Sequence, residues 1–154
     1  MSFNKKTHLS GNIQAIRLAF ALEKEHRQPT VEEIGTIQRY SGFGGLKCIL
    51  NPTQTLGDEA YWSKSEMDLF PLVAELQAMI RENCNSEEEY KRYWGSLKNS
   101  ILTSFYTPSE IVTTLADTLQ KSGITPSRFL DPSAGMGEFI SAFNPTCSSI
   151  RIYS

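Results

Sequence analysis

The stretch that decides the fold lies in the C-terminal part of the chain: Leu130-Asp131-Pro132-Ser133-Ala134-Gly135-Met136-Gly137-Glu138-Phe139. Two apolar residues, Phe129 and Leu130, lead into a carboxylate, and a turn that contains Gly135 and Gly137 follows. Glycine permits backbone conformations and close approaches that a Cβ atom forbids, and the helix expected after the turn presents free N–H groups. A buried strand, a glycine turn and a helix in this order are the architecture of a nucleotide-type cofactor site.

The two glycines alone are a weak signal, because Ile140 stands where the dinucleotide fingerprint has its third glycine. The full string is more specific. It resembles the cofactor motif Asp-Pro-small-small-Gly-x-Gly-x-Phe of S-adenosylmethionine-dependent DNA methyltransferases that act on the exocyclic amino group of adenine, and Asp131, Gly135, Gly137 and Phe139 match it. The alternative is a strand-to-helix turn that holds no ligand, with Asp131 as a turn former.

A second element, Phe105-Tyr106-Thr107-Pro108, resembles the aromatic-Thr-Pro element that precedes the glycine motif in this class. Thr107 is a suitable N-cap, Pro108 suits the first helical position, and Glu110 completes a Thr-x-x-Glu capping box. The resemblance implies that Thr107 and this helix terminus hold the methionine carboxylate of the cofactor, whereas the alternative is that Thr107 only caps the helix. The residues implied to bind the cofactor are Tyr106, Thr107, Asp131, Ser133, Ala134, Gly135, Gly137 and Phe139.

A third segment, Gln38-Arg39-Tyr40-Ser41-Gly42-Phe43-Gly44-Gly45-Leu46, is similar to one near the start of large methylase-helicase proteins of conjugative elements and phages. In those proteins it precedes the same two motifs. Its glycines predict a tight loop in which Phe43 or Leu46 is pinned while the backbone turns. The resemblance gives the loop no chemical role, and a purely structural turn is the alternative.

Elsewhere the spacing of apolar residues predicts helices. We expect them from about Ser10 to His26, from the Thr30/Glu33 capping box to about Tyr40, from near Pro71, from the Ser86/Glu89 box, and from Pro108 to about Lys121 with a stop at Gly123. The expected buried faces are Val31, Ile34 and Ile37; Leu72, Val73, Leu76 and Ile80; Tyr90, Tyr93, Trp94, Leu97 and Ile101; and Ile111, Val112, Leu115, Ala116 and Leu119. Core packing is favoured over base stacking for Tyr93 and Trp94.

Two short strands are expected, at about Arg128–Leu130 and at Ile150–Tyr153. The predicted fold is therefore mainly α. A helical N-terminal domain over residues 1–103 is followed, over residues 104–154, by the truncated start of a Rossmann-like α/β methyltransferase domain with two strands.

Composition limits the partners. The formal net charge of −2 gives no general attraction to phosphate backbones, so DNA is expected to be contacted through regions absent from these 154 residues. The cysteines Cys48, Cys84 and Cys147 have neither metal-site nor disulfide spacing, and no apolar stretch suits a signal peptide or a membrane span. We expect no metal, no membrane partner and a cytoplasmic location.

The sequence lacks further parts of the implied active site. Only Ser154 follows Tyr153, where a doubly wound site usually has an acidic residue that binds the ribose. Neither Asn51-Pro52-Thr53 nor Asn144-Pro145-Thr146 fits the catalytic Asn-Pro-Pro-aromatic motif that the resemblance implies. We therefore expect no catalytic residue here, weak or no binding of S-adenosylmethionine by this chain, and self-association as one way to cover the exposed sheet edge.

The rival hypothesis is non-enzymatic: a helical interaction module, or the relic of a disrupted gene, that binds protein or DNA through its N-terminal helices. No Ser/His/Asp set is visible, and His8 and His26 are expected to be exposed residues near helix ends rather than catalysts. The reading frame beyond codon 154 distinguishes the hypotheses, because an Asn-Pro-Pro-aromatic string there favours the methyltransferase.

Overall fold

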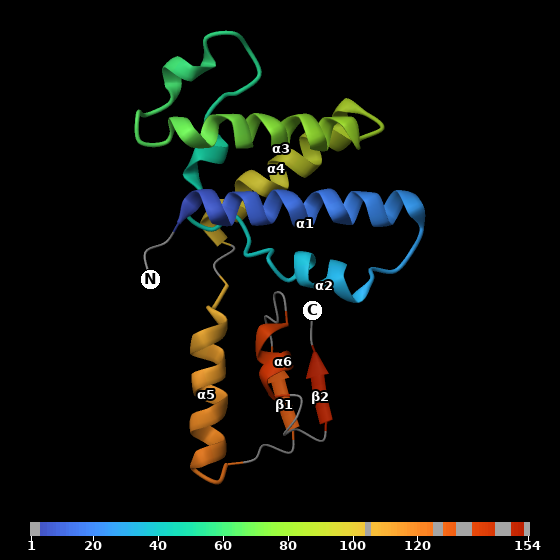
Figure 1. The fold of residues 1–154 in the computed structure, drawn as a ribbon, viewed down its shortest axis with the longest axis vertical. Coiled ribbons are helices and arrows are strands. Elements are labelled where there is room, and N and C mark those ends of the chain that lie inside the picture. The colour runs from blue at the N-terminus through green and yellow to red at the C-terminus, as the bar shows by residue number, and fades with distance from the viewer. Residues whose placement is uncertain (1–3, 104–105, 125–127, 132–136, 144–148, 153–154) are drawn as a thin grey trace. The chain divides into compact units, whose positions relative to one another are not determined.

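The computed structural model describes residues 4–103, 106–124, 128–131, 137–143 and 149–152. The prediction of a mainly α protein is confirmed, and the chain divides into two compact units, Met1–Phe105 and Tyr106–Ser154 (Figure 1). Unit 1 contains α1 (Lys5–Glu25), α2 (Val31–Ile37), α3 (Phe70–Glu82), α4 (Glu87–Thr103) and the 3-10 helices η1 (Lys47–Leu50), η2 (Asp58–Tyr61) and η3 (Met67–Leu69). Unit 2 contains α5 (Ser109–Lys121), β1 (Arg128–Asp131), α6 (Glu138–Phe143) and β2 (Ser149–Ile152).

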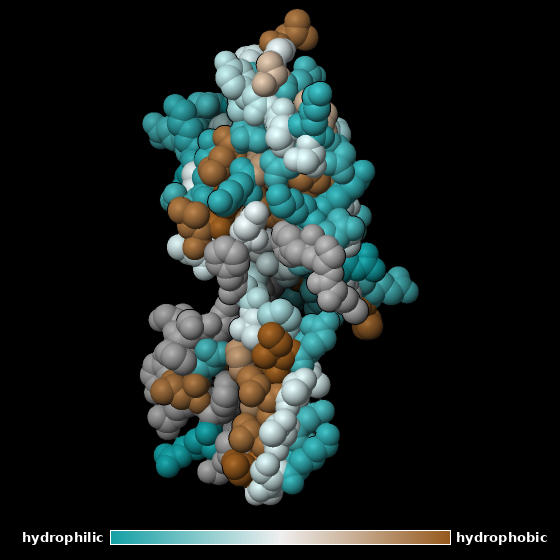
Figure 2. Space-filling view, turned by 90° about the vertical axis from the view of Figure 1, so that its left-hand side faces the viewer, coloured by the Kyte–Doolittle hydropathy of each residue, from teal (hydrophilic) through white to brown (hydrophobic). Residues whose placement is uncertain are grey.

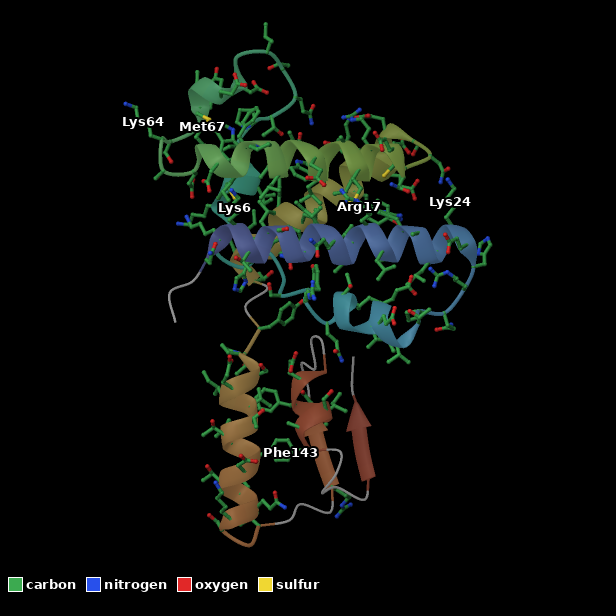
Figure 3. The ribbon with its side chains drawn as sticks, in the orientation of Figure 1. Lys6, Arg17, Lys24, Lys64, Met67 and Phe143 are labelled. Atoms are coloured by element: carbon green, nitrogen blue, oxygen red, sulfur yellow. The ribbon has the colours of Figure 1, made fainter. Side chains whose placement is uncertain are left out.

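Helix α1 begins at Lys5, so the predicted start near Ser10 is wrong. The reason is Asn4, whose Oδ1 accepts hydrogen bonds from the N–H groups of Lys6 at 3.1 Å and Thr7 at 3.2 Å. An N-cap of this kind satisfies backbone donors that a helix start otherwise leaves without partners. Lys6, Arg17 and Lys24 are spread along α1 (Figure 3).

The core of unit 1 forms between α1, α3, α4 and the segment that contains η1. Most positions predicted to be buried on α3 and α4 are confirmed, namely Val73, Leu76, Ile80, Tyr90, Trp94 and Ile101. The remaining three, Leu72, Tyr93 and Leu97, are partly buried and pack against this core. Core packing is thus the observed role of the aromatic stripe on α4. The core side chains that are at most 7 % exposed include Leu9, Ile13, Phe43, Leu46, Cys48, Ile49, Val73, Leu76, Ile80, Tyr90, Trp94 and Ile101.

Asn12 forms the central polar contact of this core. Its side chain is fully buried, its Nδ2 donates to the carbonyl of Gly42 at 2.6 Å, and its Oδ1 accepts from the N–H of Ser41 at 2.8 Å. His8 adds a contact of 3.0 Å between its Nδ1 and the Ser41 hydroxyl, so this half-buried histidine differs from the exposed residue that was expected. Helix α1 therefore fixes the start of the glycine loop through hydrogen bonds.

The loop after Ser41 turns tightly, as its glycines predict. Gly42 and Gly45 have φ of 74° and 75°, a region that side chains with a Cβ rarely occupy. Phe43 and Leu46 are both fully buried, so the prediction that one of them is pinned is confirmed for both. The N–H of Gly45 donates to the carbonyl of Ile101 at 3.2 Å, which ties the loop to the end of α4.

Two of the three positions predicted to be buried on α2, Val31 and Ile34, are exposed, and Ile37 is half-buried. Val31 is 87 % exposed and Ile34 is 40 % exposed, and α2 ends at Ile37 rather than near Tyr40. The predicted Thr30/Glu33 capping box is present. A helix of seven residues offers little surface for packing, and α2 is held by its contact with α1 together with polar contacts at its start.

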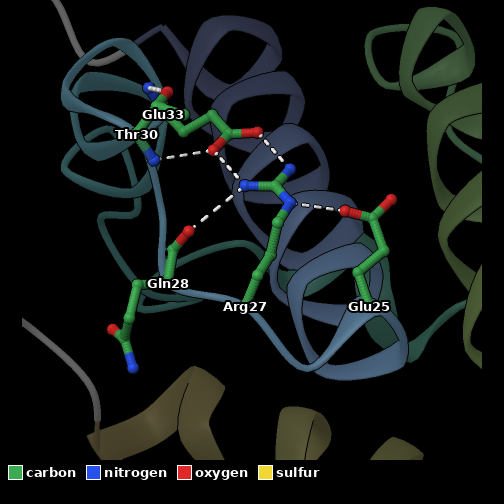
Figure 4. A network of polar contacts seen from close by, with 5 residues as sticks. All are labelled: Glu25, Arg27, Gln28, Thr30 and Glu33. Carbon is green, nitrogen blue, oxygen red and sulfur yellow. Dashed lines mark hydrogen bonds and ion pairs between the residues drawn. The ribbon is translucent and has the colours of Figure 1, made fainter.

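Those contacts centre on Arg27 (Figure 4). Its guanidinium donates to both carboxylate oxygens of Glu33 at 2.7 Å, and it also contacts Glu25 and the carbonyl of Gln28. Glu33 meanwhile accepts from the N–H of Thr30 at 2.8 Å. These donors lower the pKa of Glu33 to about 2, and the hydrogen bond from Arg27 is the largest cause.

In unit 2, α5 contacts α6, but the buried face predicted for α5 is only partly covered. Val112 is buried, whereas Ile111 and Leu115 are 51 % and 47 % exposed and contribute to an apolar band over α5 (Figure 2). The reason is that α6 has only six residues and covers less than the whole apolar face of α5. The predicted stop at Gly123 is confirmed, with φ of 74° and a hydrogen bond from the N–H of Ile124 to the carbonyl of Leu119.

Within the described residues, no helix has both the length and the apolar character that crossing a membrane requires.

Replacing Asn12 by alanine should lower the free energy of unfolding by about 2–4 kcal/mol, because Ser41 N–H and the Gly42 carbonyl lose their partner in a buried site. Chemical denaturation followed by circular dichroism measures this. The matched control is Gln14→Ala, which removes a larger amide from the exposed face of the same helix and should change the free energy by less than about 0.5 kcal/mol. Equal effects of the two substitutions would contradict the role given to Asn12.

Glu33→Gln separates the ion pair from the capping box, since a glutamine oxygen can still accept from Thr30 N–H. The pKa of Glu33 is lowered from 4.5 to about 2 in the folded chain. Its stabilising contribution is therefore present above about pH 4.5 and is lost as the pH falls toward 2. Thermal unfolding should give a lower midpoint for Glu33→Gln at about pH 7 and nearly equal midpoints at about pH 2. A constant difference over this range would exclude the Arg27 pair as its cause.

Candidate cofactor site

The candidate site is built on a short parallel sheet. Strand β1 pairs with β2 in parallel, with Arg128 opposite Ser149 and Asp131 opposite Ile152, and α6 lies between them in the sequence. The first and last residues of both strands lie within one residue of the predicted boundaries. Parallel neighbours have their carboxyl ends at the same edge of a sheet, which is where open α/β sheets bind ligands.

Asp131 is the last residue of β1 and is only 8 % exposed. The side chain of Leu130 is 60 % exposed, so the two neighbouring residues face opposite sides of the sheet. A carboxylate thus lies at the carboxyl end of the first strand, but the expected burial of the strand is wrong at Leu130, because the two-stranded sheet leaves that face uncovered.

Gly137 directly precedes α6 and has φ of 79°. A Cβ atom added there would meet only Ile140 Cδ1, at an ordinary contact distance of 3.9 Å. Glycine is therefore required by the backbone conformation and not by crowding. The carbonyl of Gly137 accepts from Ser141 N–H at 2.9 Å, so the glycine is continuous with the first turn of α6.

The start of α5 differs from the prediction. Pro108 is the N-cap, with φ of −55° and an extended ψ of 138°, and the first helical residue is Ser109. The carbonyl of Pro108 accepts from Ile111 and Val112, whereas Thr107 makes no capping hydrogen bond. The predicted Thr107/Glu110 box is therefore wrong. The reason is that the extended backbone of Pro108 moves the helix start one residue further, out of reach of Thr107.

The amino end of α5 and the carboxyl ends of β1 and β2 lie at the same end of unit 2 (Figure 1). Helix α5 runs antiparallel to the strands, and Phe143 of α6 is buried and points toward α5 (Figure 3). The structure thus brings Tyr106 and Thr107 to the end of the unit where Asp131 lies. Tyr106, Gly137 and Phe139 are half-buried and Thr107 is exposed, whereas Ser133, Ala134 and Gly135 lie outside the described residues.

The cysteines and acidic residues add no further centre in the described part of the chain, where no group of three or more His, Cys, Asp or Glu side chains could hold a metal. Cys48 and Cys84 are free thiols, and Cys147 lies outside the described residues. Burial raises the pKa of Cys48 to about 11, so this thiol is protonated and unreactive at neutral pH.

Unit 1 contains a hollow that the sequence motifs did not indicate. It has a volume of about 360 Å³ and is lined by Thr53, Gln54, Gln77, Arg81, Tyr90 and two alanines of α3. One signal was present in the sequence, because Gln77 lies four residues after Val73 and three before Ile80, on the buried face of α3. A glutamine at such a position needs polar partners.

Comparison with protein-family models, with curated proteins and with solved structures finds nothing that matches this chain.

Gly137→Ala should destabilise unit 2 by about 1–2 kcal/mol, because an alanine resists the left-handed backbone conformation. Gly95→Ala should instead stabilise α4 by up to about 1 kcal/mol, because nothing lies within 4 Å of the added Cβ and alanine favours a helix. Hydrogen exchange followed residue by residue measures both. Unchanged protection of α6 in Gly137→Ala would show that its φ does not constrain the turn.

Proposed function

We propose that this chain is part of a DNA adenine methyltransferase and that unit 2 supplies one half of its S-adenosylmethionine site. The intact protein transfers a methyl group from the cofactor to the exocyclic amino group of adenine. The observation that carries the proposal is the parallel β1–α6–β2 arrangement, with buried Asp131 at the end of β1 and left-handed Gly137 before α6. A strand, a turn and a helix of this kind begin a Rossmann-like domain.

Thr107 and the start of α5 are assigned the methionine carboxylate of the cofactor. The N–H groups of Ser109 and Glu110 precede the first hydrogen-bonded turn, and a helix start favours an anion. Among the residues described, none bonds the hydroxyl of Thr107. Because that hydroxyl is not used as a cap, it can donate to a carboxylate. The wrong prediction about capping thus favours the ligand role of Thr107 over its structural alternative.

Asp131, Gly135 and Gly137 are assigned the nucleoside side of the cofactor, with Tyr106, Ser133, Ala134 and Phe139 around it. Glycine at position 137 lets the backbone turn sharply between β1 and α6. No Asn-Pro-Pro-aromatic string occurs among the 154 residues, so this chain on its own should not methylate DNA. Adenine recognition and DNA contacts are assigned to other regions of the intact protein.

The rival function, a non-enzymatic interaction module, is favoured by one observation: α2 exposes Val31 and Ile34. That rival predicts no response of unit 2 to the cofactor, so a titration with S-adenosylmethionine distinguishes the two functions.

The test is an NMR titration of the 154-residue chain with S-adenosylmethionine. We expect backbone shifts at Thr107, Asp131 and Gly137 with a dissociation constant of roughly 0.1–1 mM, because only half of the site is present. Thr107→Val keeps the side-chain shape, removes the hydroxyl and should weaken binding roughly tenfold. The control is Thr114→Val on the same helix, where the hydroxyl bonds its own helix at the Glu110 carbonyl.

Absence of shifts in unit 2 at millimolar cofactor would refute the proposal. A dissociation constant in the low micromolar range would contradict the assignment of only half a site to this chain. Equal binding by Thr107→Val and the unmodified chain would return Thr107 to a structural role.

A further inference from the structure

A polar hollow in unit 1 lies between three segments that are far apart in the sequence. Thr53 and Gln54 come from the loop after η1, Gln77 and Arg81 from α3, and Tyr90 from α4. Its volume is about 360 Å³, which is in the range of small-molecule sites. All of these residues belong to unit 1, so the hollow is independent of the cofactor site.

Only one of the two polar atoms of the Gln77 side-chain amide has a hydrogen-bond partner among the described residues. The side chain is 7 % exposed, and its Oε1 accepts from the Thr53 hydroxyl at 2.7 Å. Within the described part of the chain, its Nε2 has no hydrogen-bond partner. Because this nitrogen is not fully enclosed, its two N–H groups are open to the hollow, where water or a ligand can accept from them.

Gln54 presents the complementary group. Its Nε2 donates to the Tyr90 hydroxyl at 2.9 Å, which orients the amide, and no described residue donates to its Oε1. The hollow therefore offers a donor from Gln77 and an acceptor from Gln54. Such a pair matches the edge of a nucleobase, where a hydrogen-bond acceptor lies beside a donor.

Arg81 and Tyr90 supply a flat surface beside these amides. The guanidinium carbon of Arg81 lies 4.0 Å from the centre of the Tyr90 ring. Tyr90 is only 4 % exposed, while half of the Arg81 side chain is exposed, so the guanidinium covers the ring and presents its outer face. Arg81 also donates to Glu87 at 2.8 Å, so a carboxylate lies beside the guanidinium and offsets its charge. A guanidinium plane held in this way is a platform for stacking a base.

From this geometry we infer that the hollow binds an unpaired nucleobase, stacked on Arg81 and hydrogen-bonded along its edge by Gln54 and Gln77. The neutral Arg81–Glu87 pair favours an uncharged planar ring over a phosphate or a carboxylate. A free nucleoside and a base in a single strand share this chemistry.

The experiment follows the side-chain amide signals of Gln54 and Gln77 by NMR in the whole chain. The probes are adenosine and a single strand of about eight deoxyadenosines, which distinguish the free nucleoside from the strand. Two control probes are N-methylacetamide, which has the donor and acceptor but no ring, and ribose 5-phosphate, which lacks the base. We expect both amides to shift with adenosine, with the strand, or with both, and to shift at least tenfold less with either control at equal concentration.

Two matched pairs of variants test the assigned contacts. Arg81→Lys keeps the charge but loses the plane and should weaken binding at least tenfold, whereas Arg92→Lys makes the same exchange on exposed α4 surface outside the hollow and should stay within about twofold. Gln77→Met removes the free N–H groups together with the Thr53 bond, and Thr53→Val removes that bond alone. Circular dichroism establishes that each variant is folded, and Arg81 is exposed enough for its variant to fold even where Gln77→Met does not.

Three results would overturn the inference. The first is that neither adenosine nor the strand shifts the two amide signals at about 10 mM base. The second is that N-methylacetamide shifts them as much as adenosine does, and the third is that Arg81→Lys binds as well as the unmodified chain. A response to N-methylacetamide equal to that of adenosine would instead indicate an amide group, such as a peptide bond, as the ligand.

Discussion

Unit 1 depends on the hydrogen bonds between buried Asn12 and the backbone of Ser41 and Gly42. The loop that follows Ser41 turns at Gly42 and Gly45, which both have a left-handed backbone conformation. It places Phe43 and Leu46 in the core, so its buried backbone groups need hydrogen-bond partners. Asn12 satisfies one donor and one acceptor of that loop. A carbonyl at the end of α4 accepts from Gly45, so α1, the loop and α4 are fixed to one another by polar groups inside an apolar core.

The helices and their order could be predicted because periodicity and caps are local properties of a sequence. The starts of α3 and α4, to within one residue, and most of the buried positions on them followed from this. The role of Asn12 could not, because an asparagine within an apolar pattern resembles an interruption until the loop that it bonds, about thirty residues away, is known. The start of α1 was missed for a related reason: Asn4 lies before the first apolar position, so its capping role appears only in the backbone geometry.

Periodicity indicates which residues share a face of a helix but not what covers that face. On α3 and α4 the other elements of unit 1 cover it, whereas on α2 and α5 the exposed residues include Val31, Ile34, Ile111 and Leu115. Helices α2 and α5 differ in how they are held. Helix α2 contacts α1 and is also held by polar contacts around Arg27, whereas α5 contacts the short helix α6. In both cases the neighbouring element covers only part of the apolar face, so periodicity alone does not fix the burial.

The two candidate sites differ in how a sequence can reveal them. The proposed cofactor site follows from contiguous strings. Its assignment of Thr107 is favoured by the failure of the predicted capping, because a hydroxyl that caps no helix can donate to an anion. The hollow around Arg81 combines side chains from three segments, none of which forms a motif. Its one signal is Gln77, whose amide lies on an otherwise apolar face and keeps a donor free. Asn12 lies on a similar face of α1 with both amide groups paired, so a buried amide marks a binding site only when the fold leaves part of its hydrogen-bonding capacity unused.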